Sequence, residues 1–89
     1  MASFTGMDIA EVRQLSATLK SKAEEIRNIQ NQLTNQLQSA QWVGPDRERF
    51  LGDWQSQHCA ALNSVIQGLE GASQTANRNA QEQESASNS

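Results

Sequence analysis

The chain has 89 residues, of which 36% are hydrophobic and only 4% aromatic, and its formal net charge is −3. This length allows one domain at most, and the acidic balance argues against nucleic acid as a partner, because phosphate binding needs a clustered basic face. No stretch approaches the roughly 20 apolar residues of a membrane span, and residues 1–15 lack the basic start and apolar core of a general secretory signal peptide. Composition by itself therefore indicates a cytosolic protein.

The apolar content is low for an independent globule, as the mean hydropathy of −0.70 shows. The apolar residues nevertheless fall in two regular stripes, which argues against simple disorder. We expect an ordered protein that completes part of its core with a partner.

The first helix is expected to follow a flexible N-terminus at residues 1–7. Asp8 and Glu11 have the spacing of a capping box, so we place helix 1 at about residues 8–41. Its apolar residues recur in steps of three and four, as in a shallowly crossing helical bundle. The predicted packing positions on this helix are Val12, Leu15, Leu19, Ile26, Ile29, Leu33 and Leu37.

A turn is expected at residues 42–45, where the helical pattern stops and restarts at once. Gly44 tolerates the left-handed conformation that closes a helix C-terminus, and Pro45 suits the first turn of the next helix. Asp46 can then cap that helix or complement its positive end. This arrangement folds two helices back on each other as an antiparallel hairpin.

The second helix is expected at about residues 46–81, within a helical hairpin domain that spans residues 8–82. Gly68 and Gly71 within it either permit a close helix crossing or mark a weak point, since each costs about 1 kcal/mol relative to Ala. Beyond Ser73 the chain is rich in Gln, Asn, Ser and Glu, so residues 83–89 are predicted to form a disordered tail. The predicted packing positions are Phe50, Leu51, Trp54, Ala61, Leu62, Val65 and Leu69.

Folding at the turn predicts which residues face each other across the hairpin. The expected pairs are Leu37 with Leu51, Leu33 with Trp54, Ile26 with Leu62, Leu19 with Leu69, and Val12 with Ala76. Large residues thus meet near the turn, and alanines lie toward the open end.

Catalysis and metal binding have little support in the sequence. His58 and Cys59 are adjacent, but neighbours on a helix point about 100° apart, and the chain has no other His, Tyr or Cys to complete a site. We interpret His58 as flanking a helix interface and Cys59 as a small packing or surface thiol. No enzyme, metal site or cofactor is predicted.

Trp42 lies just before the expected turn, where a large aromatic side chain needs a groove. It is either a plug at the bend, over Phe50 and Trp54, or an exposed anchor for a partner. Physical arguments favour the plug, and the two roles coexist if the plug borders a groove.

The string Trp42-Val43-Gly44, between two long helices in a short chain, resembles the WXG-motif family of small type VII secretion substrates, and specifically its actinobacterial members. Phe50, eight residues after the motif Trp, strengthens the resemblance, which covers residues 8 to about 80. The resemblance implies an all-α antiparallel helix-turn-helix hairpin that dimerises into an elongated four-helix bundle. It assigns Trp42 and Gly44 to the family motif and the apolar stripes to the hairpin and dimer contacts.

The same resemblance implies a non-enzymatic protein that is secreted as a folded dimer by a membrane-bound, ATPase-driven machine, without a general signal peptide. Family dimers usually carry a Tyr followed four residues later by Asp or Glu, and this chain contains no Tyr. A related small WXG-motif protein as partner is therefore favoured over a second copy of the chain. The alternative is an intracellular helical adaptor that docks its hairpin on a larger partner protein.

Overall fold

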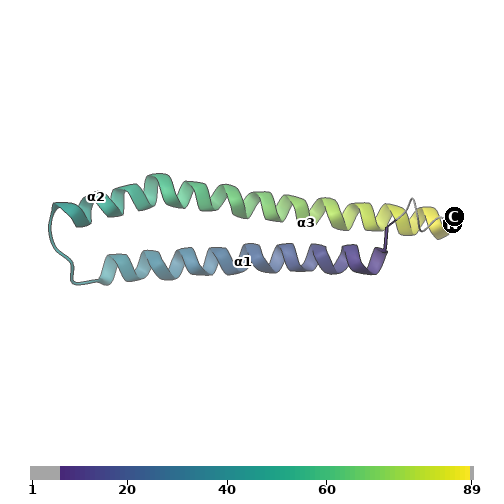
Figure 1. Cartoon of the computed structure of the whole chain (residues 1–89), viewed down its shortest axis with the longest axis horizontal. Coiled ribbons are helices and arrows are strands. Elements are labelled where there is room, and N and C mark those ends of the chain that lie inside the picture. The colour runs from purple at the N-terminus through teal and green to yellow at the C-terminus, as the bar shows by residue number, and fades with distance from the viewer. Residues whose placement is uncertain (1–6, 89) are drawn as a thin grey trace.

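The computed structural model describes residues 7–88 as an antiparallel helical hairpin (Figure 1). Helix α1 (Ile9–Ser39) leads into a short connection, which is followed by α2 (Pro45–Asp53), a π-helical segment η2 (Trp54–His58) and α3 (Cys59–Asn88). The last three elements run on without a break and lie beside α1. The all-α hairpin predicted from the sequence is confirmed. The expected flexible N-terminus lies outside the described residues except for Met7.

The hairpin is long and narrow, with extents of 65 × 17 × 17 Å. Two interhelical hydrogen bonds define its register, one between Thr34 and Trp54 near the turn and one between Ser16 and Ser73 toward the open end. Both agree to within one residue with the register predicted from the sequence. Among the described residues, no helix combines the length and apolarity needed to cross a membrane.

Helix α1 begins with a capping interaction and ends before the turn motif. The Asp8 side chain accepts a hydrogen bond from the Glu11 backbone N–H at 3.1 Å, as the capping spacing predicts. At the other end Ala40 adopts an extended conformation, with φ −66° and ψ 142°, so the helix stops at Ser39 instead of near residue 41. The Ala40 N–H still bonds the Gln36 carbonyl at 2.9 Å, which satisfies one of the last helical acceptors.

The second arm differs from the single helix expected at residues 46–81. It begins at Pro45, and the π-helical turn η2 separates α2 from α3. In η2 the Cys59 N–H bonds the Trp54 carbonyl, an i to i−5 step that changes the rotational phase of α2 relative to α3.

Helix α3 also continues beyond the expected end, through residues predicted to form a disordered tail. The helix reaches Asn88, and Ser89 lies outside the described residues. Two side-chain contacts hold this end against α1, because Arg13 donates hydrogen bonds to Gln81 and Glu84, each at 3.1 Å. After Gly71 the sequence has no Gly or Pro to interrupt the helix.

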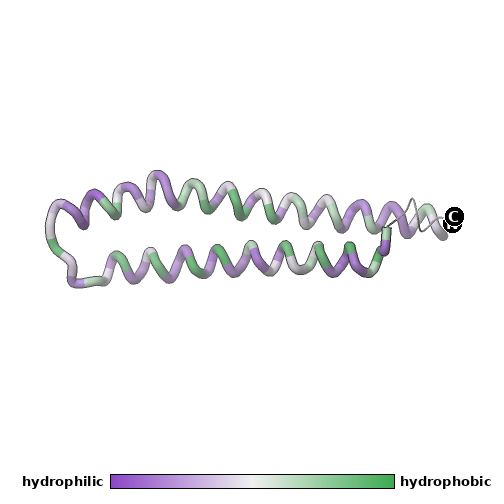
Figure 2. The backbone as a smooth tube through the Cα atoms, viewed as in Figure 1, coloured by the Kyte–Doolittle hydropathy of each residue, from purple (hydrophilic) through white to green (hydrophobic). Residues whose placement is uncertain are grey.

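The interior of the hairpin is thin, because two helices share only one contact surface. Among residues 7–88 the buried apolar side chains are Ala23, Ile66 and Ala80. Hydrophobic segments recur along the whole of α1 (Figure 2). Several of the predicted packing residues therefore remain partly in water.

Candidate functional site

The turn motif is built around Gly44. This residue has φ 132° and ψ 174°, a backbone conformation that side-chain-bearing residues rarely adopt. The sequence predicts that Gly44 closes helix 1, but it instead stands at the N-terminal cap of α2. Its carbonyl accepts the Glu48 N–H at 3.3 Å, and Pro45 follows at the first helical position, where its fixed φ is favourable.

Aromatic and aliphatic side chains gather at the turn. The rings of Trp42 and Phe50 lie 5.9 Å apart between centroids and are tilted by 51°. Trp42 is nevertheless 40% exposed, Phe50 42% and Val43 95%. Trp42 thus contacts Phe50, one of the two aromatic residues named for the plug, whereas the ring contact of Trp54 is with His58. Part of the Trp42 side chain stays exposed to a partner.

Trp54 has a different environment from the one predicted for it. Its indole Nε1 donates a hydrogen bond to Thr34 Oγ1 at 2.8 Å, and its ring contacts His58 with centroids 6.2 Å apart. The register from the sequence places Leu33 opposite Trp54, whereas the structure places Thr34 there. The inward position of Thr34 could have been recognised from its spacing to Leu37, which is three residues away.

The predicted packing residues divide into two groups by exposure. Those that are partly covered within the hairpin are Val12, Leu19, Ile26, Leu37, Leu51, Trp54, Leu62 and Leu69. Those that remain exposed are Leu15, Ile29, Leu33, Phe50, Ala61 and Val65. The large aliphatic members of the exposed group, apart from Leu33 at 40%, are about half in water, with Leu15 and Ile29 at 51% and Val65 at 49%.

Helix geometry places these exposed aliphatic residues on one side of the hairpin. Leu15 directly precedes the inward-facing Ser16, and Val65 directly precedes the inward-facing Ile66. Because consecutive residues differ by about 100° and the two helices run antiparallel, a residue just before an inward position lies on the same side in both helices. We call this side the apolar face, and its large side chains are Leu15, Ile29, Leu33 and Val65.

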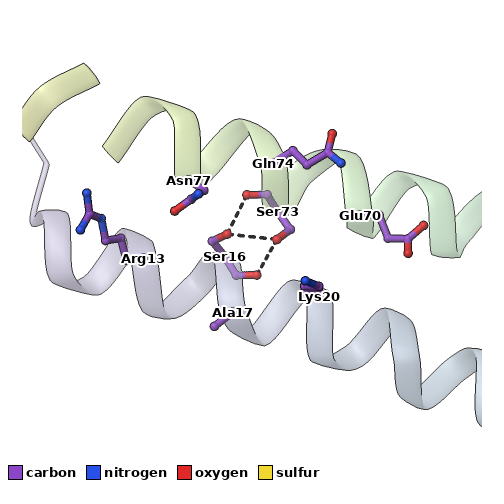
Figure 3. Close-up of a pocket in the computed structure, with 8 residues that line it drawn as sticks. All are labelled: Arg13, Ser16, Ala17, Lys20, Glu70, Ser73, Gln74 and Asn77. Atoms are coloured by element: carbon purple, nitrogen blue, oxygen red, sulfur yellow. Dashed lines mark hydrogen bonds between the residues drawn. The ribbon is translucent and has the colours of Figure 1, made fainter. Parts of the chain in front are cut away.

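The opposite side carries the residues that directly follow the inward positions. Most of these residues are polar, such as Glu24, Gln67 and Gln74. There a groove of about 460 Å³ is lined by Arg13, Ser16, Ala17, Lys20, Glu70, Ser73, Gln74 and Asn77 (Figure 3). Ion pairs cross the helices on this side at Arg13–Glu84, 3.1 Å, and Arg27–Glu70, 3.3 Å. The hairpin is therefore amphipathic across its width, a feature that the sequence stripes alone did not resolve.

His58 and Cys59 differ in how far they are covered. His58 is exposed beside Trp54, and Cys59 is a free, partly covered cysteine. Within the part of the chain that is described, no group of three or more His, Cys, Asp or Glu residues could hold a metal ion. The features that can act in recognition are the turn aromatics and the apolar face.

Comparison with known protein families shows to which family this helical hairpin belongs. The chain matches the WXG100 family, described as proteins of 100 residues with WXG, over residues 5–87. It belongs to the WXG100 family. No curated protein and no solved structure gave a match. As a WXG100 protein it is a small helical protein of the type VII substrate-like class, and its Trp42-Val43-Gly44 sequence directly precedes α2.

Proposed function

We propose that this WXG100 protein is exported as a folded hairpin by a type VII secretion system, paired lengthwise with a second hairpin in an elongated four-helix bundle. The exposed apolar face carries the proposal. Leu15, Ile29 and Val65 lie at the surface beside an interior that buries few large side chains. WXG100 proteins typically pair with partners in secretion, which supports this use of the face.

The energetic reason is the apolar area that one hairpin leaves in water. Complete burial of a large aliphatic side chain contributes about 1.5–3 kcal/mol, so each half-exposed residue retains roughly 1 kcal/mol for association. The face combines residues of both helices and runs along much of the hairpin, which suits another elongated helical pair. The exposed part of Trp42 at one end would contact the partner or the secretion ATPase.

We propose a related WXG-motif protein as the partner, in preference to a second copy. The Tyr-containing export signal usual in the family needs a Tyr on at least one subunit, and these 89 residues contain none. We therefore assign the export signal to the partner, so that this chain is exported as the other subunit of the same dimer. Its destination under this proposal is outside the cell, and its role there is non-enzymatic.

Paired substitutions on the two sides of the hairpin test the assembly. Ile29→Asp and Val65→Asp place a carboxylate on the apolar face. Asn31→Asp and Gln67→Asp are the matched controls, which place the same group on the polar side. Each pair flanks one inward residue, Gln30 for positions 29 and 31 and Ile66 for positions 65 and 67. Native mass measurement after co-purification should show a two-hairpin complex that the first two variants lose and the control variants keep. A stable, folded monomer of the parent protein at micromolar concentration would reject the dimer.

Export needs a separate experiment in a host with a type VII system. The protein should reach the culture medium only while the secretion ATPase is intact, and the Ile29→Asp variant should remain in the cell. Secretion that continues after loss of the ATPase would refute the route and leave the dimer result unaffected. Recovery of a larger intracellular protein in place of a small hairpin would favour the adaptor function.

A further inference from the structure

A reciprocal pair of buried serines joins the two helices in the open half of the hairpin. Ser16 Oγ donates to the Ser73 carbonyl at 2.7 Å, and Ser73 Oγ donates to the Ser16 carbonyl at 2.7 Å (Figure 3). The two hydroxyl oxygens lie 3.0 Å apart, and each residue is only 7% exposed. Each hydroxyl thus bonds the main chain of the other helix.

The fully buried apolar side chains near this pair are small. Ala23 and Ala80 are buried there, whereas the larger Val12, Leu19 and Leu69 are only partly covered. Alanines lack the shape that makes larger side chains interlock, whereas Ile66 and Trp54 supply that shape closer to the turn. The polar groove of about 460 Å³ borders the serines on the polar side of the hairpin.

We infer that the Ser16–Ser73 pair is a register lock, which selects one axial alignment of the open half of the hairpin. A shift of α3 by one heptad would place Ser16 opposite Ile66 or Ala80, and Ser73 opposite Ile9 or Ala23. Either shift breaks the observed bonds of the pair and places each hydroxyl opposite an apolar side chain. Loss of these bonds penalises the shifted alignments, as a single buried polar residue does in coiled coils.

The geometry also predicts that the lock has two independent halves. Because each hydroxyl bonds a backbone carbonyl, Ser16→Ala keeps the bond from Ser73, and Ser73→Ala keeps the bond from Ser16. Either single variant should therefore retain the observed register. Only the double variant removes every interhelical bond of the pair.

The register can be measured with two spin labels on the helices. In a Cys59→Ala background, labels at Gln14→Cys and Asn63→Cys occupy exposed positions that are offset by about 18 Å along the hairpin axis. A shift of one heptad changes this offset by about 10 Å. Dilution with unlabelled protein removes distances between chains, so the measurement does not depend on dimerisation or export.

The parent and both single variants should give one narrow distance distribution. Ser16→Ala/Ser73→Ala should add a second population displaced by up to about 10 Å, or broaden the distribution over that range. A matched control, Ser21→Ala/Ser64→Ala at exposed positions, should change nothing. A double variant with the parent distribution would overturn the inference. So would a double variant that unfolds, because the pair would then be needed for folding and not for alignment.

Discussion

The indole of Trp54 donates its Nε1 hydrogen to Thr34 Oγ1 at 2.8 Å, and the same hydroxyl donates to the Gln30 carbonyl at 2.8 Å. This chain of hydrogen bonds ties the π-helical segment η2 to α1 just below the turn. The indole N–H is thereby satisfied where its ring is half-buried. One threonine thus connects the two arms of the hairpin near the turn.

Replacing Thr34 tests this connection. Thr34→Val keeps the shape and a similar helix propensity but removes the hydroxyl, so we expect a loss of about 1–2 kcal/mol in the free energy of unfolding. Chemical denaturation measures the change. Thr18→Val, at an exposed position of the same helix, is the control and should have little effect. Equal stability of the two variants would show that the hydrogen bond contributes nothing.

The backbone of Gly44 leads to a second prediction. At φ 132° a Cβ is strained although it would meet no atom within 4 Å, so Gly44→Ala should cost about 1–3 kcal/mol through conformation alone. Thermal unfolding followed by circular dichroism checks the loss. An unchanged midpoint would mean that the turn relaxes to another conformation at no cost.

Gly68 and Gly71 should behave in the opposite way. Both lie within α3 and a Cβ at either position meets nothing within 4 Å, so neither glycine serves a close helix crossing inside the hairpin. Gly68→Ala and Gly71→Ala should each raise the free energy of unfolding by about 0.5–1 kcal/mol. A variant that stabilises the hairpin yet dissociates the two-hairpin complex would place the partner against this side of α3, contrary to the apolar-face assignment.

Trp42 is expected to matter more for recognition than for stability. Trp42→Ala removes a ring contact worth about 0.5–1.5 kcal/mol, whereas Trp42→Phe preserves an aromatic surface against Phe50. Unfolding measurements should show a modest loss of stability for Trp42→Ala. Export assays should show a large loss of secretion for the same variant. If neither stability nor export changes, the exposed part of the ring has no role in this protein.

Ile26 and Ile29 are adjacent stripe residues that the structure distinguishes. Ile26 is partly covered within the hairpin, whereas Ile29 is 51% exposed. Ile26→Asp should unfold the hairpin, because it forces a carboxylate against the apolar interior, and Ile29→Asp should only dissociate the complex. Far-ultraviolet circular dichroism and native mass separate the outcomes. Retained helicity in Ile26→Asp would contradict its place inside the hairpin.

The sequence was sufficient for those features that depend on local chemistry and on period. The capping pair Asp8 and Glu11 located the start of α1, and Gly44-Pro45 located the reversal of the chain. The spacing of apolar residues on each arm predicted a register that agrees with the Thr34–Trp54 and Ser16–Ser73 bonds. These features follow from neighbours within a few residues, or from simple folding at the turn.

Only the tertiary structure decided which side of each stripe faces inward. Periodicity defines a broad apolar stripe but not which part of the stripe faces the other helix. Ile26 and Ile29 are therefore equivalent in the sequence pattern, and only the packing of α3 against α1 distinguishes them. The Ser16–Ser73 bonds join residues that are 57 positions apart in the sequence, and the hydrogen bond from Arg13 to Glu84 joins residues that are 71 positions apart. Contacts of this separation depend on both helices at once, and so no local pattern in the sequence reveals them.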